Sequence, residues 1–297
     1  MSLINVDFSG LSEPATKLVE KISDAIGVLY EPTKIKKIAK AHSEVKKIEL
    51  QSSIELTELE ERALQRTLHA QARKQHNIDN ITFKAARDIN PQEQNDIEFL
   101  DKDWINYFFN QCEDISDDMM QSLWSRVLAG EAKSRGSFSK RTLNFLSTLD
   151  KRDAELITKL GITIWNQHHQ PMPIIFNHKD EEIQKIGLNY DALRHLEAIG
   201  VITLGTMNYI LRFKDDLCYF SYYNESIMLK INTAKNASFI PKEQNTVNIG
   251  IVLLTNTGRE LIRICGSKPD INYFHYTLKK FMEEHEVFTP IQLKNKK

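Results

Sequence analysis

Residues 189–204, NYDALRHLEAIGVITL, change from a helical pattern to a β-strand pattern. Asn189 is a favourable N-cap, and apolar residues recur at steps of three from Leu193 to Ile199. Gly200 ends the helical pattern, and a β-branched run follows at once. A helix, a glycine stop and a pair of strands form the layout of a winged-helix-like module, which short mixed α+β packing units share.

This α+β pattern extends over residues 171–297. Pro171 and Pro173 lie beside an apolar run at 174–176 that predicts a strand. Further strands are predicted at 201–204, 209–213, 219–223, 227–231, 247–254 and 287–293. A turn at 255–258, a short helix at 260–264 and an amphipathic helix with Tyr273, Leu278, Phe281 and Met282 complete the prediction.

The preceding residues carry helical patterns instead. Helices are predicted to begin at Ser12, after Pro32, at Asp101, at Ser116, at Ser139 and at Asp150, the last of them reaching Ile164. We therefore expect a mostly α protein with a C-terminal α+β part. Its segments are N-terminal helices with a basic long helix at 1–90, a helical bundle at 91–170 and the winged-helix-like or mixed α+β module at 171–297.

The composition is that of a folded globular protein, since 41% of the 297 residues are hydrophobic and 27% are charged. Lys+Arg total 39 against 40 for Asp+Glu, so overall charge predicts neither a nucleic-acid nor a membrane partner. No apolar run approaches the roughly 20 residues of a spanning helix, and no secretory signal pattern is present. We expect a cytoplasmic protein, peripheral to the inner membrane if its basic segment binds lipid.

Motifs for catalysis or cofactor binding are absent from the sequence: it has no phosphate loop, no GxGxxG, no HExxH and no GxSxG. The adjacent His168 and His169 point different ways without a third ligand nearby, which favours a loop over a zinc site. The acidic run 180–182 with Lys185 is better explained as a helix start than as a metal nuclease site. Cys112, Cys218 and Cys265 form no CxxC and are expected to be buried thiols. These patterns predict a non-enzymatic protein without cofactor or metal.

The segment 31–50 is locally basic. At 100° per residue, Lys36, Lys40 and Lys47 lie near one line of a helix, with apolar residues on another face. Such a helix can lie on lipid headgroups or on nucleic acid, and a solvated face on a packed helix is the alternative. The candidate binding residues are Lys34, Lys36, Lys37, Lys40, Lys46 and Lys47.

Several blocks of the sequence resemble a bacterial family of unknown function. They are GLSEPATKLVEKISDAIGVLYEPTKIKKIAKA (10–41), DWINYFFNQCEDISDDMMQSLWSRVLAGE (103–131), GSFSKRTLNFLSTLDKRDAEL (136–156) and LLTNTGRELIRI (253–264). The N-terminal layout of a helix, a proline and a basic helix is similar to that of abortive-infection alpha proteins. The resemblance implies a bacterial or prophage origin and a role in phage exclusion, and it supplies no catalytic residues.

Two functions are favoured by the sequence, and an enzyme whose active site is assembled from scattered carboxylates, without a recognisable motif, is a third that stays open. The first is a non-enzymatic interaction protein in phage defence of the abortive-infection type. It would act on a protein partner or a second copy of itself and contact an anionic membrane or nucleic acid through the basic helix. The second is a DNA-binding regulator that uses the winged-helix-like C-terminal module, with Arg194 as the base-reading cation of the 189–200 helix.

Overall fold

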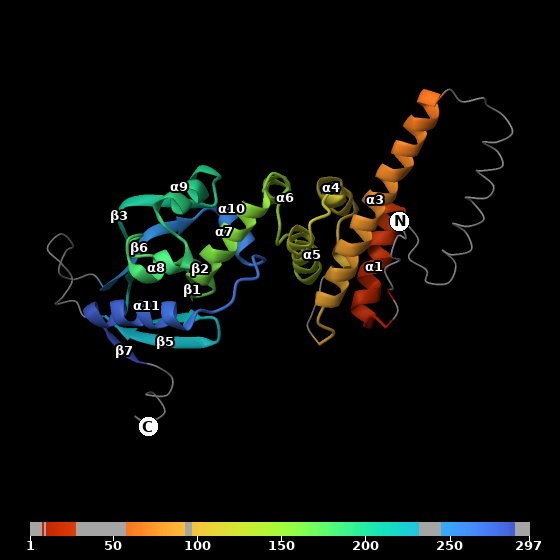
Figure 1. Ribbon diagram of the computed structural model, residues 1–297. Helices are drawn as coiled ribbons and strands as arrows, with labels where there is room; N and C mark the ends of the chain where they lie inside the picture. Colours follow the sequence, from red (N-terminus) through yellow and green to blue (C-terminus); the bar gives the residue numbers. More distant parts are fainter. Residues whose placement is uncertain (1–7, 9, 28–57, 93–96, 232–244, 289–297) are drawn as a thin grey trace. The chain divides into compact units, whose positions relative to one another are not determined.

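The computed structural model describes residues 8, 10–27, 58–92, 97–231 and 245–288 (Figure 1). Contacts within the chain form two compact units, residues 1–148 and 149–297. No helix in the described ranges is long and apolar enough to cross a membrane. The six candidate lysines between 34 and 47 lie outside the described residues.

The first unit is helical, as predicted for the N-terminal part. Its elements are α1 (Glu13–Ile26), α3 (Glu58–Asp88), η1 (Ile97–Phe99), α4 (Lys102–Cys112), α5 (Asp118–Lys133) and α6 (Lys140–Ser147). Trp104 and Trp124 are both buried on either side of Phe108, whose ring centroid lies 5.2 Å from each indole. Three large aromatic side chains therefore form the centre of the contact between α4 and α5.

Helix α3 has two different halves. From Asn77 onward it contributes buried residues to the bundle, whereas residues 58–63 are all exposed. Figure 1 shows this N-terminal half of α3, in orange, projecting beyond the other helices of the first unit. Only the second half of α3 is therefore held by packing within this unit.

Capping residues fix where the helices begin. Ser12, Asp101, Ser139 and Asp150 accept hydrogen bonds from the first turns of α1, α4, α6 and α7 (Lys151–Ile162), as their positions in the sequence predict. The prediction that Ser116 is the N-cap of α5 is wrong by one residue. Asp117 caps α5, because its carboxylate accepts from the backbone N–H groups of Met119 and Met120.

The second unit is mixed α+β, which confirms the predicted change of class. After α7 its helices are α8 (Glu181–Ile186), α9 (Tyr190–Ala198), α10 (Asn256–Ile262) and α11 (Ile271–Glu284). Its strands are β1 (Ile164–Gln167), β2 (Gln170–Pro173), β3 (Ile202–Phe213), β4 (Leu217–Tyr222), β5 (Glu225–Lys230), β6 (Asn245–Leu254) and β7 (Glu286–Phe288).

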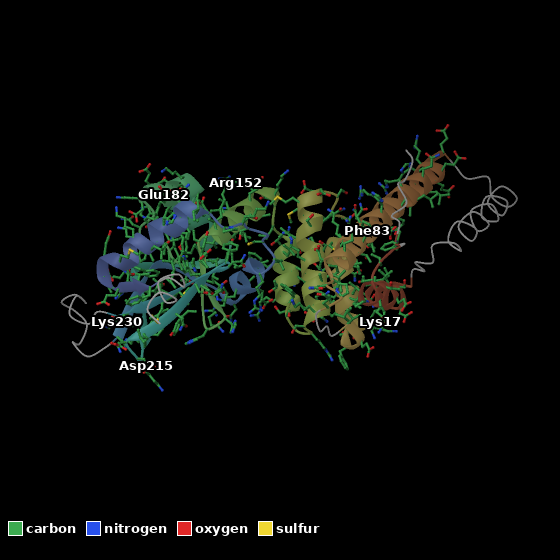
Figure 2. The ribbon with its side chains drawn as sticks, turned by 90° about the horizontal axis from the view of Figure 1, so that it is seen from below. Lys17, Phe83, Arg152, Glu182, Asp215 and Lys230 are labelled. Carbon is green, nitrogen blue, oxygen red and sulfur yellow. The ribbon has the colours of Figure 1, made fainter. Side chains whose placement is uncertain are left out.

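These strands form two sheets. The larger has the order β2-β1-β4-β5-β7, and all its pairs are antiparallel. Lys230 at the end of β5, labelled in Figure 2, lies 4.0 Å from the Glu286 carboxylate of β7. The smaller sheet pairs β3 with β6, and a parallel bridge joins Ile175 to Gly250 of β6.

Three local predictions for the second unit are wrong. Ile164 is the first residue of β1 rather than part of α7, because Thr163 ends that helix. The run 174–176 forms only the bridge at Ile175, while the strand lies earlier, at β2. The predicted turn 255–258 is the start of α10, whose N-cap is Thr255.

The core of the second unit is aromatic. Trp165 of β1 stacks on Phe274 of α11 at 5.6 Å, and α11 thereby covers the larger sheet. The hydroxyl of the buried Tyr273 donates to the backbone carbonyls of Thr163 (3.0 Å) and Ile174 (2.7 Å). Burial raises the pKa of this phenol, which therefore remains a neutral donor.

Candidate interaction surface

Helix α9 is fixed to its surroundings on both sides. His195 Nε2 lies 2.6 Å from a carboxylate oxygen of Asp153 in α7. On the other side Glu197 accepts a hydrogen bond of 2.8 Å from the backbone N–H of Leu204 in β3 and also pairs with Arg194. Because these contacts hold the helix, its outward face keeps a fixed orientation.

Beside α9, strand β3 leaves the regular ladder. Leu204 of β3 pairs with Val252 of β6, and the next pair along the ladder is Tyr209 with Gly250. The four residues 205–208 of β3 therefore lie opposite one residue of β6, Ile251. Met207 in this bulge is 79% exposed. Bulges redirect side chains at the edges of sheets, and this one presents a large apolar side chain to solvent.

A hollow of about 430 Å³ lies between α9 and the bulge. Its lining is Phe176, Asn177, His178, Tyr190, Leu193, Arg194, Leu204, Gly205, Thr206 and Ile251. The ring of Tyr190, which is 54% exposed, lies 5.3 Å from the ring of His178. We call His178, Tyr190, Arg194, Thr206 and Met207 the α9–β3 surface. Tyrosine, methionine and arginine are the residue types enriched at protein interfaces.

The charges around α9 do not resemble those of a nucleic-acid-binding helix. Residues 179–199 contain five acidic side chains and three of Lys or Arg. The single arginine on α9, Arg194, is paired with Glu197, and Lys185 of α8 is paired with Glu181 and Glu182. Binding to phosphate requires a local excess of cations. This surface therefore suits a partner without strong negative charge.

The pair of Asp153 and His195 belongs to the cap of α7. Asp153 completes a capping box with Asp150, in which each carboxylate accepts the backbone N–H of the other residue. Burial alone would raise the pKa of the Asp153 carboxyl. The hydrogen bonds from His195 and from the Asp150 backbone outweigh burial and hold that pKa below its ordinary value. This contact gives His195 a structural role.

Replacing Asp153 by asparagine should remove a pH-dependent part of the stability. A carboxyl whose pKa falls on folding stabilises the protein above its unfolded pKa of about 3.9, and the contribution is lost as pH falls through the folded pKa. At pH 7 we expect Asp153→Asn to lower the free energy of unfolding by about 1.5–3 kcal/mol, the range for hydrogen bonds to charged groups. Urea unfolding at several pH values should show wild type and variant converging from about pH 5 to about pH 2.

The matched control for this experiment is Asp191→Asn, which changes an exposed carboxylate on α9. Surface substitutions of this kind usually change stability by no more than about 0.5 kcal/mol. A constant difference between wild type and Asp153→Asn at every pH would contradict the assigned role of the carboxylate.

The remaining residues considered from the sequence do not come together in a site. His168 and His169 form the two-residue turn between β1 and β2, both with positive φ. Residues 181 and 182 begin α8, in agreement with the interpretation of the acidic run as a helix start. All three cysteines are buried and unbridged, as expected. Over the described ranges, no group of three or more His, Cys, Asp or Glu side chains could hold a metal ion.

Sequence reasoning missed the α9–β3 surface. The sequence did contain one indication of the bulge: the predicted strand pattern stops after residue 204, at Gly205, and resumes at residue 209. A Cβ on Gly205 would lie 2.5 Å from the carbonyl oxygen of Met207, so the tight bend requires glycine. Whether such an interruption is a bulge or a hairpin depends on the partner strand, and β6 is distant in sequence.

The fold and this surface define a protein of two compact units, one helical and one mixed α+β, with a preformed hollow on the second. A family model described as "Protein of unknown function (DUF2806)" matches residues 61–278. The chain belongs to this family, which confirms the expectation of a family of unknown function. No curated protein and no solved structure matches the chain.

Proposed function

We propose that this protein is a non-enzymatic interaction protein that binds a protein partner through the α9–β3 surface. The observation that carries the proposal is the exposed Met207 beside the hollow that Tyr190 and Arg194 line. Aromatic, methionine and arginine side chains around a preformed hollow are typical anchors for a partner. The contacts of Glu197 and His195 hold the hollow in place, which lowers the entropic cost of binding.

The order of elements in the second unit supports a winged-helix-like assignment within this proposal. Helix α7 is followed by the hairpin of β1 and β2, the bridged segment at Ile175, α8, a turn containing Gly187, α9 and β3, which pairs with β6 after the intervening strands β4 and β5. In such modules the second helix of the helical pair is the one that contacts DNA, and α9 holds that place in this chain. The same helix borders the hollow here.

A DNA-binding regulator is the second candidate, and the order of elements is what favours it. It predicts that the full chain selects a defined duplex over random DNA and loses this selection in Arg194→Ala. The paired state of Arg194 and the acidic surroundings of α9 favour a protein partner instead. Selection of one duplex in a competition assay would replace our proposal with this one.

The biological setting that we propose is phage defence, with a second contact through the basic segment of Lys34, Lys36, Lys37, Lys40, Lys46 and Lys47. Binding of this segment to anionic vesicles or to nucleic acid should weaken as salt rises and nearly vanish in Lys34→Glu/Lys37→Glu/Lys40→Glu. Unchanged binding in this variant would reject the contact.

Phage plating efficiency on bacteria that express the protein at a low level tests the function. We expect fewer plaques with the wild type, and recovery of plaques with the Lys34→Glu/Lys37→Glu/Lys40→Glu variant and with Tyr190→Ser/Met207→Ser. The control Ile271→Ser/Met282→Ser changes two exposed apolar side chains on α11, outside the surface, and should protect as the wild type does.

Two results would count against the proposal. Equal plaque numbers on bacteria that express the wild-type protein and on bacteria that carry an empty vector, over a broad phage panel, would reject the defence role. Recovery of plaques in the α11 control as well would show that the loss is not specific to the α9–β3 surface.

A further inference from the structure

A second hollow of the C-terminal unit has a different chemical character. It encloses about 310 Å³, a volume at the lower end of the range for small-molecule sites. Its lining is Gly161, Ile164, Asn166, His169, Pro171, Tyr223, Ile262, Arg263, Gly266 and Ser267. The polar members are a guanidinium, an imidazole, an amide and two hydroxyls, and none of the lining residues is acidic.

The polar side chains arrive from four separate segments. Asn166 belongs to β1, His169 to the turn after it, Tyr223 to the turn between β4 and β5, and Arg263 to the end of α10. Both turn residues have positive φ, at 63° for His169 and 49° for Tyr223. Such backbone is strained for residues other than glycine, and it places both rings at the hollow.

Hydrogen bonding leaves donors available to a ligand. Tyr223 Oη lies 2.7 Å from Ser267 Oγ, and burial raises the pKa of this phenol, so it stays protonated at neutral pH. The Tyr223 hydroxyl also donates to the backbone carbonyl of Gly161 at 3.3 Å, so the hydroxyls of Tyr223 and Ser267 are both engaged within the protein. Among the described residues, Arg263 has no ion pair, and neither Asn166 nor His169 has a side-chain hydrogen bond.

The close approach that builds this hollow depends on Gly161. A Cβ at this position would lie 2.4 Å from Ser267 Oγ and 2.6 Å from Cys265 Sγ. The residue is part of α7, where glycine destabilises a helix relative to alanine. The small size of Gly161 therefore allows the close contact with residues 265–267, and it does not stabilise the helix.

From these observations we infer that the hollow binds a small organic anion. Its carboxylate or phosphate group would be held by Arg263 and Asn166, and its apolar part would contact Ile164, Pro171 and Ile262. A guanidinium with neutral donors and no neighbouring carboxylate is the arrangement that recognises such a group. This inference is independent of the α9–β3 surface and of the proposed partner.

Titration calorimetry on the full chain can test the inference with three probes of similar size: phenyl phosphate, benzoate and the neutral benzamide. We expect saturable binding of at least one anion, at least about tenfold tighter than benzamide and weakened by salt. Arg263→Gln should reduce the affinity for that anion by about tenfold or more. The anion that binds identifies the head group as phosphate or carboxylate.

The control is Arg259→Gln, which removes another exposed arginine from α10 that pairs with Asn256 and does not line the hollow. This variant should bind the anion as the wild type does, and NMR shifts on binding should include the amide of Gly266. Binding of benzamide as tight as that of the anions, equal losses in the two arginine variants, or no saturable binding of any probe would overturn the inference.

Discussion

The substitution Gly250→Ala adds one methyl group and should lower the free energy of unfolding of the second unit by a large amount. A Cβ at this position would lie 2.0 Å from the carbonyl oxygen of Ile175, and the residue has a φ of 89°. That oxygen also accepts a hydrogen bond of 2.8 Å from the backbone N–H of Ile251. The methyl group therefore separates β6 from the segment before α8, and we expect a loss of about 3–5 kcal/mol from overpacking and backbone strain together.

Gly200→Ala is the control that separates these two effects. Gly200 also has a positive φ, at 82°, but nothing lies within 4 Å of a Cβ there. Its replacement should cost only the left-handed backbone penalty of about 1–2 kcal/mol. Urea unfolding, with hydrogen exchange of β3 and β6 to report on the second unit, measures both variants. Equal losses would contradict the close approach of Ile175 to Gly250.

The second large effect is expected at Glu131 in the first unit. This buried carboxylate near the C-terminal end of α5 accepts the backbone N–H groups of Gly136 (2.6 Å) and Phe138 (3.0 Å). The Phe138 carbonyl in turn accepts the indole N–H of Trp104 at 3.0 Å. The helix dipole disfavours an acidic side chain at the C-terminal end of a helix, so these hydrogen bonds are what stabilises Glu131 there. Glu131→Ala leaves the buried N–H of Phe138 and the part-buried N–H of Gly136 without this acceptor and should cost about 2–5 kcal/mol.

Two further variants make this prediction specific. Glu131→Gln retains one acceptor oxygen but places an amide N–H₂ against a donor, so its loss should lie between those of wild type and alanine. Glu20→Ala removes an exposed acid of α1 and should change stability by no more than about 0.5 kcal/mol. Thermal unfolding measures all three, and a glutamine variant as unstable as the alanine variant would argue against the separate contribution of the two hydrogen bonds.

Local signals in the sequence predicted much of the fold. Caps such as Ser12 and Asp150, and the stop at Gly200, act over a few residues and are visible in any one segment. Long-range contacts were not visible. Strand β2, which contains Pro171 and Pro173, was missed because its strand character comes from pairing with β1. The role of Gly250 depends on Ile175, which is far away in the chain.

The candidate surface could be predicted only in part. The helix was predicted together with its one base-reading cation, Arg194, but the bulge that presents Met207 depends on the pairing of β3 with a distant strand. The six candidate lysines between 34 and 47 lie outside the described residues, so their role remains a prediction.

Site-specific photo-crosslinking in living bacteria tests the proposed partner binding most directly. The photoreactive amino acid p-benzoylphenylalanine would replace Met207 on the α9–β3 surface or, as a control, Ile271, which is 61% exposed at the start of α11. We expect one discrete protein adduct from position 207 and none from position 271. Absence of an adduct from position 207, or the same adducts from both positions, would contradict the claim that this surface binds a protein partner.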